Sequence, residues 1–233
     1  MLYWFLKHVL AGPVLRVLFR PWARGVDNLP EAGPAIVVAN HLSFMDSVFV
    51  PLALPRRVVY LAKDEYFRRP GLRGALVRRF FLATGQLPMD RSGGAGAEAS
   101  LGMGRKVLEE GGVLGIYPEG TRSPDGRLHR GRTGAARLAL ATGAPVVPVA
   151  VVGTDRLRPA GALLPRLRRV GVIVGEPLHL GGPDPTAAHD RFALRRTTDA
   201  VMDEIMRLSG QEYVPSYAAH ARARLLTAER PGG

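Results

Sequence analysis

The sequence predicts an α/β fold in which a mixed, mostly parallel central sheet is flanked by helices and preceded by an apolar helical segment. Two observations support this fold class. Short apolar runs rich in β-branched residues recur along the chain, and longer stretches compatible with helices separate them. Uninterrupted apolar strands are typical of a sheet covered on both faces, and alternating strands and helices favour parallel pairing.

The first 20 residues are predicted to form a membrane-interfacial helical segment. Residues 1–19 are mostly apolar, but Lys7, Gly12, Pro13 and Arg16 interrupt the run. A helix that spans a membrane needs about 20 nearly uninterrupted apolar residues. We therefore expect the segment to lie in the interface, with Lys7 and Arg16 reaching toward lipid phosphates. The alternative is a terminal helix that packs on the protein's own core.

Five apolar runs are the predicted strands, at residues 35–39, 58–61, 113–117, 146–152 and 170–174. The predicted helices lie at residues 45–54, 71–83, 95–110, 133–142 and 187–209. A short segment at 85–89 is expected to be an edge strand, because Pro88 has no N–H to donate to a second neighbour. The folded domain is predicted to extend over residues 21–210, and residues 211–233 are predicted to be a surface tail.

Composition excludes several kinds of site. The 233 residues are 46% hydrophobic and 22% charged, which is ordinary for a folded chain. Cysteine is absent, so disulfide frameworks, cysteine nucleophiles and thiolate zinc sites are excluded. The net charge of +12 favours a partner that carries phosphate, which could be a membrane, a small molecule or a nucleic acid. No nucleic-acid-binding signature accompanies the charge, so we expect no nucleic-acid partner.

Polar side chains follow the predicted strands at their carboxyl ends, where ligands bind in open α/β sheets. They are Asn40, His41, Ser43 and Asp46 after the first strand, Lys63 after the second, Asp90 and Arg91 after the edge strand, and Glu119, Gly120, Thr121 and Arg122 after the third. The glycine allows close backbone approach, and arginine can hold phosphate oxygens with two hydrogen bonds. Residues 119–122, together with Lys63 and Arg91, predict a phosphate site.

His41 and Asp46 are candidates for a catalytic pair. Five residues apart on one helix, they would point about 140° away from each other. If His41 lies on the turn before the helix and Asp46 in its first turn, the carboxylate can reach the imidazole and leave the other nitrogen as a general base. The alternatives are that Asp46 caps the helix, since Ser43 and Asp46 match S-x-x-D, and that His41 is structural.

The nucleophile is expected to come from the substrate. The chain contains neither the G-x-S-x-G pattern of serine hydrolases nor the H-E-x-x-H pattern of zinc proteases. A base without a protein nucleophile is suited to activating a hydroxyl group on a phosphorylated acceptor. Backbone amides at the start of the helix after His41 are candidate donors to an oxyanion.

Four sequence blocks resemble, in the same order, those of the PlsC-type lysophospholipid acyltransferases, the 1-acylglycerol-3-phosphate acyltransferase family. The blocks are N-H-x-S-x-x-D at residues 40–46, G-x-x-x-x-D-R at 85–91, Y-P-E-G-T-R-S at 117–123 and the proline block at 144–149. Tyr117 stands where the family usually has Phe. Arg130 and Arg132 lie in a segment that is usually richer in lysine.

The resemblance implies that His41 deprotonates an acceptor hydroxyl for attack on a fatty-acyl thioester, and that Asp46 orients His41. It also implies the acceptor-binding residues, which are Lys63, Arg91, Glu119, Gly120, Thr121 and Arg122. The acceptor would be lysophosphatidic acid and the product phosphatidic acid, with acyl-CoA or acyl-carrier protein as donor. No cofactor and no metal are implied.

The resemblance further implies an enzyme of phospholipid biosynthesis, bound peripherally or monotopically at the cytoplasmic face of the cell membrane. Residues 21–210 would then be the acyltransferase domain. One alternative is the acylation of another lysolipid, in lysophospholipid remodelling or on an amino-acid lysolipid. A different class of alternative is a protein that binds lipid or nucleic acid without catalysis.

Overall fold

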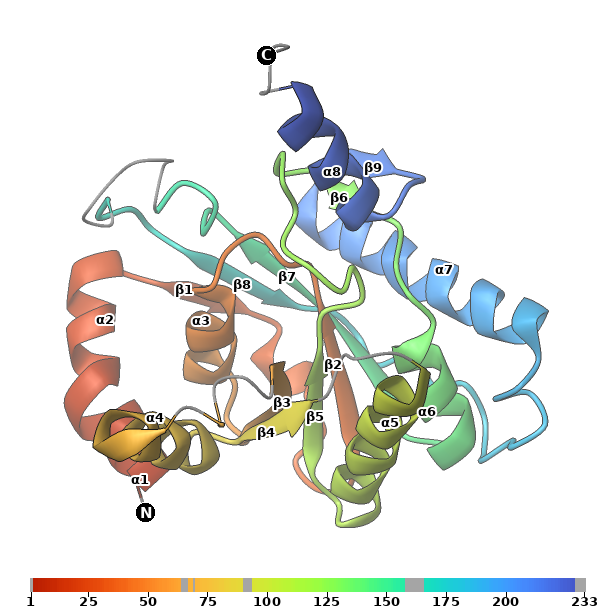
Figure 1. Cartoon of the computed structure of the whole chain (residues 1–233), viewed down its shortest axis with the longest axis horizontal. Coiled ribbons are helices and arrows are strands. Elements are labelled where there is room, and N and C mark those ends of the chain that lie inside the picture. The colour runs from red at the N-terminus through yellow and green to blue at the C-terminus, as the bar shows by residue number, and fades with distance from the viewer. Residues whose placement is uncertain (1, 64–66, 69, 90–93, 158–165, 229–233) are drawn as a thin grey trace.

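A computed structural model describes residues 2–63, 67–68, 70–89, 94–157 and 166–228. Its centre is a seven-stranded sheet (Figure 1). The strands are β1 (Trp22–Arg24), β2 (Ala35–Ala39), β3 (Val58–Lys63), β4 (Gln86–Met89), β5 (Val113–Ile116), β7 (Val146–Val152) and β8 (Gly171–Val174). Their spatial order is β1-β8-β7-β2-β5-β3-β4, and only the β7–β8 pair is antiparallel. The predicted mixed, mostly parallel sheet is confirmed.

The five predicted strands are all present, with bounds that differ from the expected ones by no more than two residues. The segment with Pro88 forms β4, which pairs only with β3 and therefore lies at an edge, as expected. The strand β1 was not predicted; it is three residues long, partly exposed and paired with β8 at the opposite edge. A strand this short carries no periodicity that could reveal it.

The central strand β2 explains why the apolar runs are uninterrupted. It lies between β5 and β7, with Ile36 opposite both Leu114 and Val146, and all five of its residues are buried. Successive side chains point to opposite faces. Val37 therefore packs into one apolar cluster and Val38 into another on the other side of the sheet.

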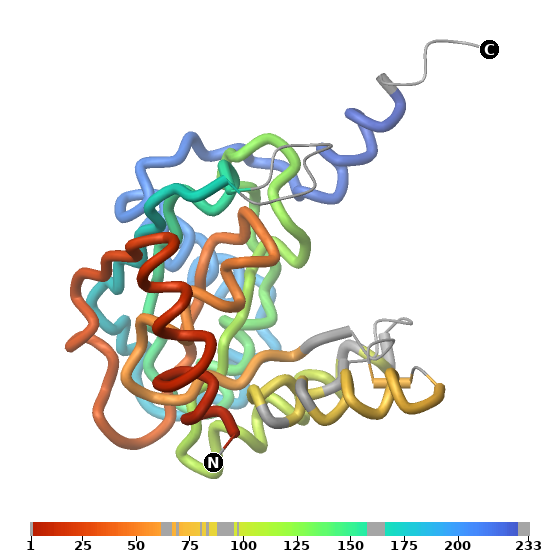
Figure 2. The backbone as a smooth tube through the Cα atoms, turned by 90° about the vertical axis from the view of Figure 1, so that its left-hand side faces the viewer, coloured from red at the N-terminus to blue at the C-terminus, as the bar shows by residue number. Residues whose placement is uncertain are grey.

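Helices cover both faces of the sheet. Figure 1 shows α5 (Gly94–Glu109), α6 (Gly134–Thr142) and α7 (Arg191–Ser209) on one side, and α3 (Asp46–Ala53) with the N-terminal helices on the other. The helix α4 (Gly71–Ala83) extends from the body near β4 (Figure 2). All five predicted helices are found. The start of α7 is shifted from 187 to Arg191, because Asp190 caps it by accepting from the Phe192 amide.

Residues 2–19 form a continuous helical stretch of α1 (Leu2–Phe5), a π-helical turn η1 (Leu6–Leu10) and α2 (Ala11–Phe19). Its mean hydropathy is 1.3 and 11% of it is buried; within the described ranges it alone is long and apolar enough to cross a membrane. Its inner face packs on α3, where the rings of Phe19 and Phe49 meet edge to face at 5.5 Å. Its outer face exposes apolar side chains, Val17 at 74%. The segment therefore packs on the protein's own core along one face and leaves apolar side chains exposed on the other, while its contact with a membrane stays a prediction.

One expectation for this segment is wrong. Lys7 was expected to reach outward toward lipid phosphates, but its ammonium group turns inward and donates to the carbonyl of Leu54 at the end of α3. The charge that interrupts the apolar run therefore attaches the helix to the protein. Arg16 has no such partner among the described residues.

The C-terminal segment is more than a surface tail. The short helix η2 (Val26–Asn28) follows β1. A second, two-stranded parallel sheet joins β6 (Leu128–His129) to β9 (Tyr213–Val214), and α8 (Ala218–Ala228) follows β9. Because β6 lies after β5, this pairing brings the end of the chain to the loops at the carboxyl edge of the main sheet (Figure 1).

Candidate active site

His41 and Asp46 form the predicted pair. The strand β2 ends at Ala39, the chain turns through residues 40–45, and Asp46 is the first residue of α3. The turn doubles the chain back, so Nδ1 of His41 lies 2.9 Å from Oδ2 of Asp46. A carboxylate accepts at this position, which places the proton of a neutral imidazole on Nδ1 and leaves Nε2 as the basic nitrogen.

Asp46 is fully buried and accepts four hydrogen bonds. Besides His41, its Oδ2 atom accepts from the amides of Leu42 and Ser43 at 2.7 and 2.8 Å, and its Oδ1 atom accepts from the Thr154 hydroxyl. The carboxylate thus holds both the turn before the helix and the His41 ring. Met45 rather than Asp46 is the N-cap of α3 and has no side-chain cap hydrogen bond, and the catalytic role of the pair stays a prediction. The amides of Leu42 and Ser43 are engaged here. At the start of α3, where the oxyanion donors were expected, the amides of Asp46, Ser47 and Val48 already donate to the carbonyls of Ser43, Phe44 and Met45.

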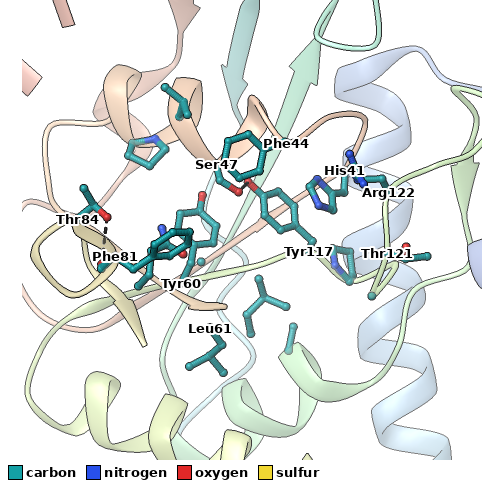
Figure 3. Close-up of a pocket in the computed structure, with 18 of the residues that line it drawn as sticks. His41, Phe44, Ser47, Tyr60, Leu61, Phe81, Thr84, Tyr117, Thr121 and Arg122 are labelled. Carbon is teal, nitrogen blue, oxygen red and sulfur yellow. Dashed lines mark hydrogen bonds between the residues drawn. The ribbon is translucent and has the colours of Figure 1, made fainter. Parts of the chain in front are cut away.

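The His41 ring lies against an aromatic support and faces a pocket. The ring of Tyr117 stacks on it with centroids 3.9 Å apart and planes at 13° (Figure 3). The Tyr117 hydroxyl is 3.1 Å from Oγ of Ser47, and burial raises the pKa of Tyr117 well above its usual value, which keeps this support neutral. Nε2 of His41 has no partner among the described residues.

Glu119 has a different role from the one expected. It was predicted to bind the acceptor, but its side chain is buried and does not line the pocket. One carboxylate oxygen accepts from the backbone amide of His41 at 2.9 Å and the other from that of His129 at 3.1 Å. Burial raises the pKa of Glu119 to about 7, although the two amide hydrogen bonds act in the opposite direction. Glu119 therefore holds the turn that carries His41, on the side away from the pocket.

Asn40 also supports the turn that carries His41, a role that was not predicted for it. Its side chain is buried and makes two hydrogen bonds to the backbone of Val151 in β7, at 2.9 and 2.7 Å. It also donates to the side chain of Gln211 at 2.6 Å. A polar residue directly before His41 was the only sequence signal of this role.

His41 opens into a pocket of about 1320 Å³ that has an apolar wall and a basic rim. The volume exceeds that of sites for drug-sized ligands, which suits a substrate with a long chain. The apolar wall comprises Leu6, Ala11, Leu15, Val48, Leu52, Leu61 and Phe81. The basic rim comprises Arg122, Arg132, Arg137 and Arg222. His41 therefore lines the same pocket as the apolar wall and the basic rim.

Three of the predicted acceptor-binding residues line this pocket together with His41. They are Gly120, Thr121 and Arg122, and Figure 3 shows Thr121 and Arg122 beside His41. The Ser123 amide donates to the carbonyl of His41 at 2.7 Å, which fastens this loop to the catalytic turn. Lys63 is the last residue of β3, at the carboxyl edge of the sheet, and its side chain lies outside the described part of the chain. Arg91 also lies outside the described residues.

Comparison with known proteins identifies the family of the chain. The profile of the Acyltransferase family matches residues 21–152, more than half of the chain. The chain is 30% identical over 177 residues to a chloroplastic 1-acyl-sn-glycerol-3-phosphate acyltransferase, LPAT1, of Arabidopsis thaliana, and the match covers 75% of this chain and 48% of that protein. The chain spans about half the length of such plant relatives.

Two bacterial proteins match over most of their length. The 1-acyl-sn-glycerol-3-phosphate acyltransferase of Bacillus subtilis is 29% identical over 187 residues, which cover 79% of this chain and 86% of that protein. The crystal structure of the 1-acyl-sn-glycerophosphate (LPA) acyltransferase PlsC from Thermotoga maritima superposes with a TM-score of 0.60 at 25% identity, covering 87% of this chain and 80% of that one.

Proposed function

The chain belongs to the Acyltransferase family, and we propose that it transfers a fatty acyl group from a thioester to the free hydroxyl of lysophosphatidic acid, giving phosphatidic acid. The observation that carries this proposal is the position of Nε2 of His41. This unpartnered nitrogen opens into one pocket with an apolar wall and a basic rim. An acceptor that is both acylated and phosphorylated matches both surfaces at once.

The proposed reaction begins with the acceptor hydroxyl hydrogen-bonded to Nε2 of His41. The hydroxyl oxygen attacks the thioester carbonyl carbon while its proton moves to Nε2, and Asp46 stabilises the imidazolium that forms. The tetrahedral intermediate then collapses, the carbon–sulfur bond breaks, and the thiolate takes the proton from Nε2. General base catalysis of this kind contributes roughly 10²- to 10⁴-fold to the rate.

Arg122 is proposed to hold the acceptor phosphate. Its side chain is exposed at the pocket and has no carboxylate partner in the described part of the chain. A guanidinium group can bind two phosphate oxygens at once, whereas the ammonium group of lysine acts as a point charge. We expect Arg122→Ala to raise the acceptor KM by about tenfold or more, and Arg122→Lys to restore it in part. An unchanged acceptor KM in both variants would assign Arg122 a structural role.

The outer face of the N-terminal helices is proposed to bind the membrane surface. Trp4 is 61% exposed, and Val9, Leu10, Val14 and Val17 are exposed beside it along α1, η1 and α2. The inner face of the same helices lines the pocket. A lipid acceptor could therefore enter without crossing water. We propose peripheral or monotopic attachment at the cytoplasmic face of the membrane, where acyl-CoA and acyl-carrier protein would be available as donors.

Vesicle sedimentation tests this attachment. A full chain with Trp4, Val14 and Val17 replaced by Ser should pellet several-fold less with anionic phospholipid vesicles than the parent does, because apolar burial drives interfacial binding. Phe192→Ser is the matched control, since Phe192 is equally apolar and 87% exposed but lies on α7. If the triple variant pellets like the parent, the contact lies elsewhere, and the arginines of α4, Arg73, Arg78 and Arg79, are then the surface to test.

A matrix of donors and acceptors tests the activity. Purified protein is mixed with acyl-CoA or acyl-carrier protein and with lysophosphatidic acid, other lysophospholipids or an amino-acid lysolipid, and thiol release is measured with lipid analysis of the product. We expect the largest kcat/KM with lysophosphatidic acid. A larger kcat/KM with another lysolipid would mean that this lysolipid is the acceptor, with the same mechanism. The absence of thiol release with every pair would reject acyl transfer.

A further inference from the structure

The arginines of the basic rim differ in whether a carboxylate neutralises them. Arg137 forms an ion pair with Glu98 at 3.4 Å. Arg122, Arg132 and Arg222 have no acidic partner in the described ranges of the chain. Arg122 belongs to the block that resembles known acyltransferases and is proposed above to hold the acceptor phosphate, whereas Arg132 and Arg222 have so far been assigned no ligand of their own. They are therefore two uncompensated positive charges at the same pocket.

Arg132 is held in place between a glycine and an aromatic ring. Gly120 has φ +74°, and a Cβ atom at this position would lie 2.7 Å from Nε of Arg132, so the arginine side chain lies directly over the glycine. On its other side, Cζ of Arg132 is 5.4 Å from the ring centroid of Tyr217, a cation–π contact. The Arg132 amide donates to the carbonyl of Pro118 at 2.7 Å. The guanidinium group is thus restrained before any ligand binds.

Tyr217 is itself fixed by hydrogen bonds of the C-terminal segment. The pairing of β6 with β9 ends three residues before it, and the carbonyl of Ser216 accepts from the Arg130 amide at 3.1 Å. The guanidinium of Arg130 also lies over the Tyr217 ring, at 5.6 Å. Two guanidinium groups that share one ring without a carboxylate repel each other, and a bound anion would relieve this repulsion.

The helix α8 adds a side chain of the C-terminal segment to the pocket. Arg222 lines the pocket, while Arg224, two residues further along α8, does not. Side chains two residues apart on a helix point about 200° apart, so one faces the pocket and the other faces away. Paired guanidinium groups without acidic partners are suited to phosphate oxygens.

We propose that Arg132 and Arg222 form a second phosphate-binding subsite beside Arg122, with Tyr217 as the residue that positions Arg132. The ligand is a phosphate group carried by one of the two substrates, either the acceptor's phosphate or the phosphates of a nucleotide-linked donor; this rests on the acyl transfer proposed above. The C-terminal segment, which lies beyond the part matched by the family profile, would then complete the substrate pocket.

Direct binding to the full chain tests the subsite without turnover. Calorimetric titrations use coenzyme A and lysophosphatidic acid, with pantetheine and monoacylglycerol as their phosphate-free counterparts. Arg132→Gln and Arg222→Gln should each weaken one of the two phosphate-bearing ligands by about tenfold and leave both phosphate-free ligands unchanged. The affected ligand identifies the source of the phosphate. Arg224→Gln, the matched control on the same helix, should stay within about twofold of the parent.

Variants of Tyr217 test its positioning role. Tyr217→Phe keeps the ring and should bind like the parent, whereas Tyr217→Leu removes the cation–π contact and should weaken the same ligand as Arg132→Gln does. In the acyl-transfer assay the loss should appear in KM for that substrate with kcat unchanged. A loss equal in Tyr217→Phe and Tyr217→Leu would overturn the role of the ring.

Different experimental results would contradict the proposed subsite and the proposed function. If Arg132→Gln and Arg222→Gln bind both phosphate-bearing ligands as the parent does while the parent transfers acyl groups, the subsite is wrong and the function stands. If the parent transfers no acyl group but binds a phosphate-bearing ligand through Arg132 and Arg222, the function is wrong and the subsite stands.

Discussion

His41 and His129 each lie about 3 Å from an aspartate carboxylate, and one buried residue connects the two pairs. Nδ1 of His41 is 2.9 Å from Asp46, and Nε2 of His129 is 3.0 Å from Asp125. The carboxylate of Glu119 accepts from the backbone amides of both histidines. By distance and by residue type the two pairs are alike.

The burial of the two partners is reversed between the pairs. The side chain of His41 is 17% exposed and its Nε2 faces the pocket, whereas the side chain of His129 is fully buried and its Nδ1 lies 3.3 Å from the carbonyl of Ser216. Among the aspartates, Asp46 is the buried one, while Asp125 is partly exposed and forms an ion pair with Arg127 at 2.7 Å. Partial burial raises the pKa of Asp125, but hydrogen bonds from Arg127 and His129 outweigh it and lower this pKa below its usual range.

The difference shows that a histidine–aspartate distance does not by itself identify a catalytic base. A base needs one ring nitrogen held by the carboxylate and the other within reach of a substrate. His41 meets both conditions, while both nitrogens of His129 already face protein acceptors. We therefore assign proton transfer to the first pair and the support of β6 and the C-terminal segment to the second.

The largest expected effect is that of His41→Ala, which removes the proposed base. We expect kcat to fall on the order of 10⁴-fold while the melting temperature stays close to that of the parent, because the side chain is partly exposed. His129→Gln is the matched control. It should lower stability by about 1 to 3 kcal/mol through lost buried hydrogen bonds and keep kcat per folded molecule.

Thiol release and thermal unfolding, measured on the same preparations, separate these outcomes. If folded His41→Ala turns over near the parent's rate, the mechanism is wrong. If His129→Gln loses kcat as strongly as His41→Ala does, the contrast between the two pairs fails.

The next largest effect is expected for Asp46→Asn. An amide nitrogen facing Nδ1 would favour the imidazole tautomer that carries its proton on Nε2, so the ring could no longer accept a proton there. We expect kcat to fall on the order of 10³-fold with acceptor KM little changed. Asp125→Asn should lose stability and keep kcat. Steady-state kinetics of both variants decide the matter, and equal kcat losses would contradict the assignment.

The sequence was sufficient to predict those features that depend on interactions between residues close together in the chain. The apolar runs predicted the five strands because burial on both faces leaves a pattern in consecutive residues. His41 and Asp46 are five residues apart, so the geometry of one turn decides whether they meet. The edge position of β4 followed from a single residue, Pro88, because its missing N–H is a local property.

The sequence was insufficient where the partners are distant along the chain. Glu119 binds the His41 amide across 78 residues, Thr154 binds Asp46 across 108, and Asn40 binds Gln211 across 171. A carboxylate in the chain shows its charge but not whether it is buried, so Glu119 was assigned to substrate rather than to the backbone. Lys7 was misjudged for the same reason, because its acceptor, Leu54, lies 47 residues away, just after the end of α3.

A smaller effect, which depends on pH, is expected for Glu119→Gln. The pKa of Glu119 is raised to about 7 in the folded protein, so the folded state holds this proton more tightly than the unfolded chain does. The stabilisation is therefore fully present below about pH 4.5 and is lost as pH rises to about 7, a change of up to roughly 3 kcal/mol. The substituted glutamine cannot titrate, and its amide nitrogen would face one of the two backbone N–H groups.

Chemical denaturation between about pH 4.5 and 7.5 tests this effect. Glu119→Gln should be less stable than the parent at the acidic end of the range, and the difference in unfolding free energy should narrow as pH rises toward about 7. Glu119 holds both segments that carry a histidine, His41 and His129. The affinity for substrate and the stability of the fold should therefore change together in this variant. A difference that is constant over the range would show that Glu119 keeps an ordinary pKa in the folded protein.

The smallest effect is expected for Thr154→Val, which changes only the environment of Asp46. The Thr154 hydroxyl donates to Oδ1 of Asp46, and both groups are buried. Valine has the same shape without the donor, so Asp46 keeps His41, Leu42 and Ser43 but loses one of its four hydrogen bonds. One such bond is worth about 1 kcal/mol, so we expect kcat to fall about fivefold.

Thr198→Val is the matched control for this last variant, because Thr198 is also buried and donates to a backbone carbonyl, that of Leu194 in α7. The two variants should lose similar amounts of stability, but only Thr154→Val should lose kcat. A loss in Thr154→Val as large as that in Asp46→Asn would mean that the orientation of Asp46, rather than its contact with His41, limits proton transfer. Equal kcat values in the two threonine variants would restrict the catalytic role of Asp46 to its Oδ2 atom.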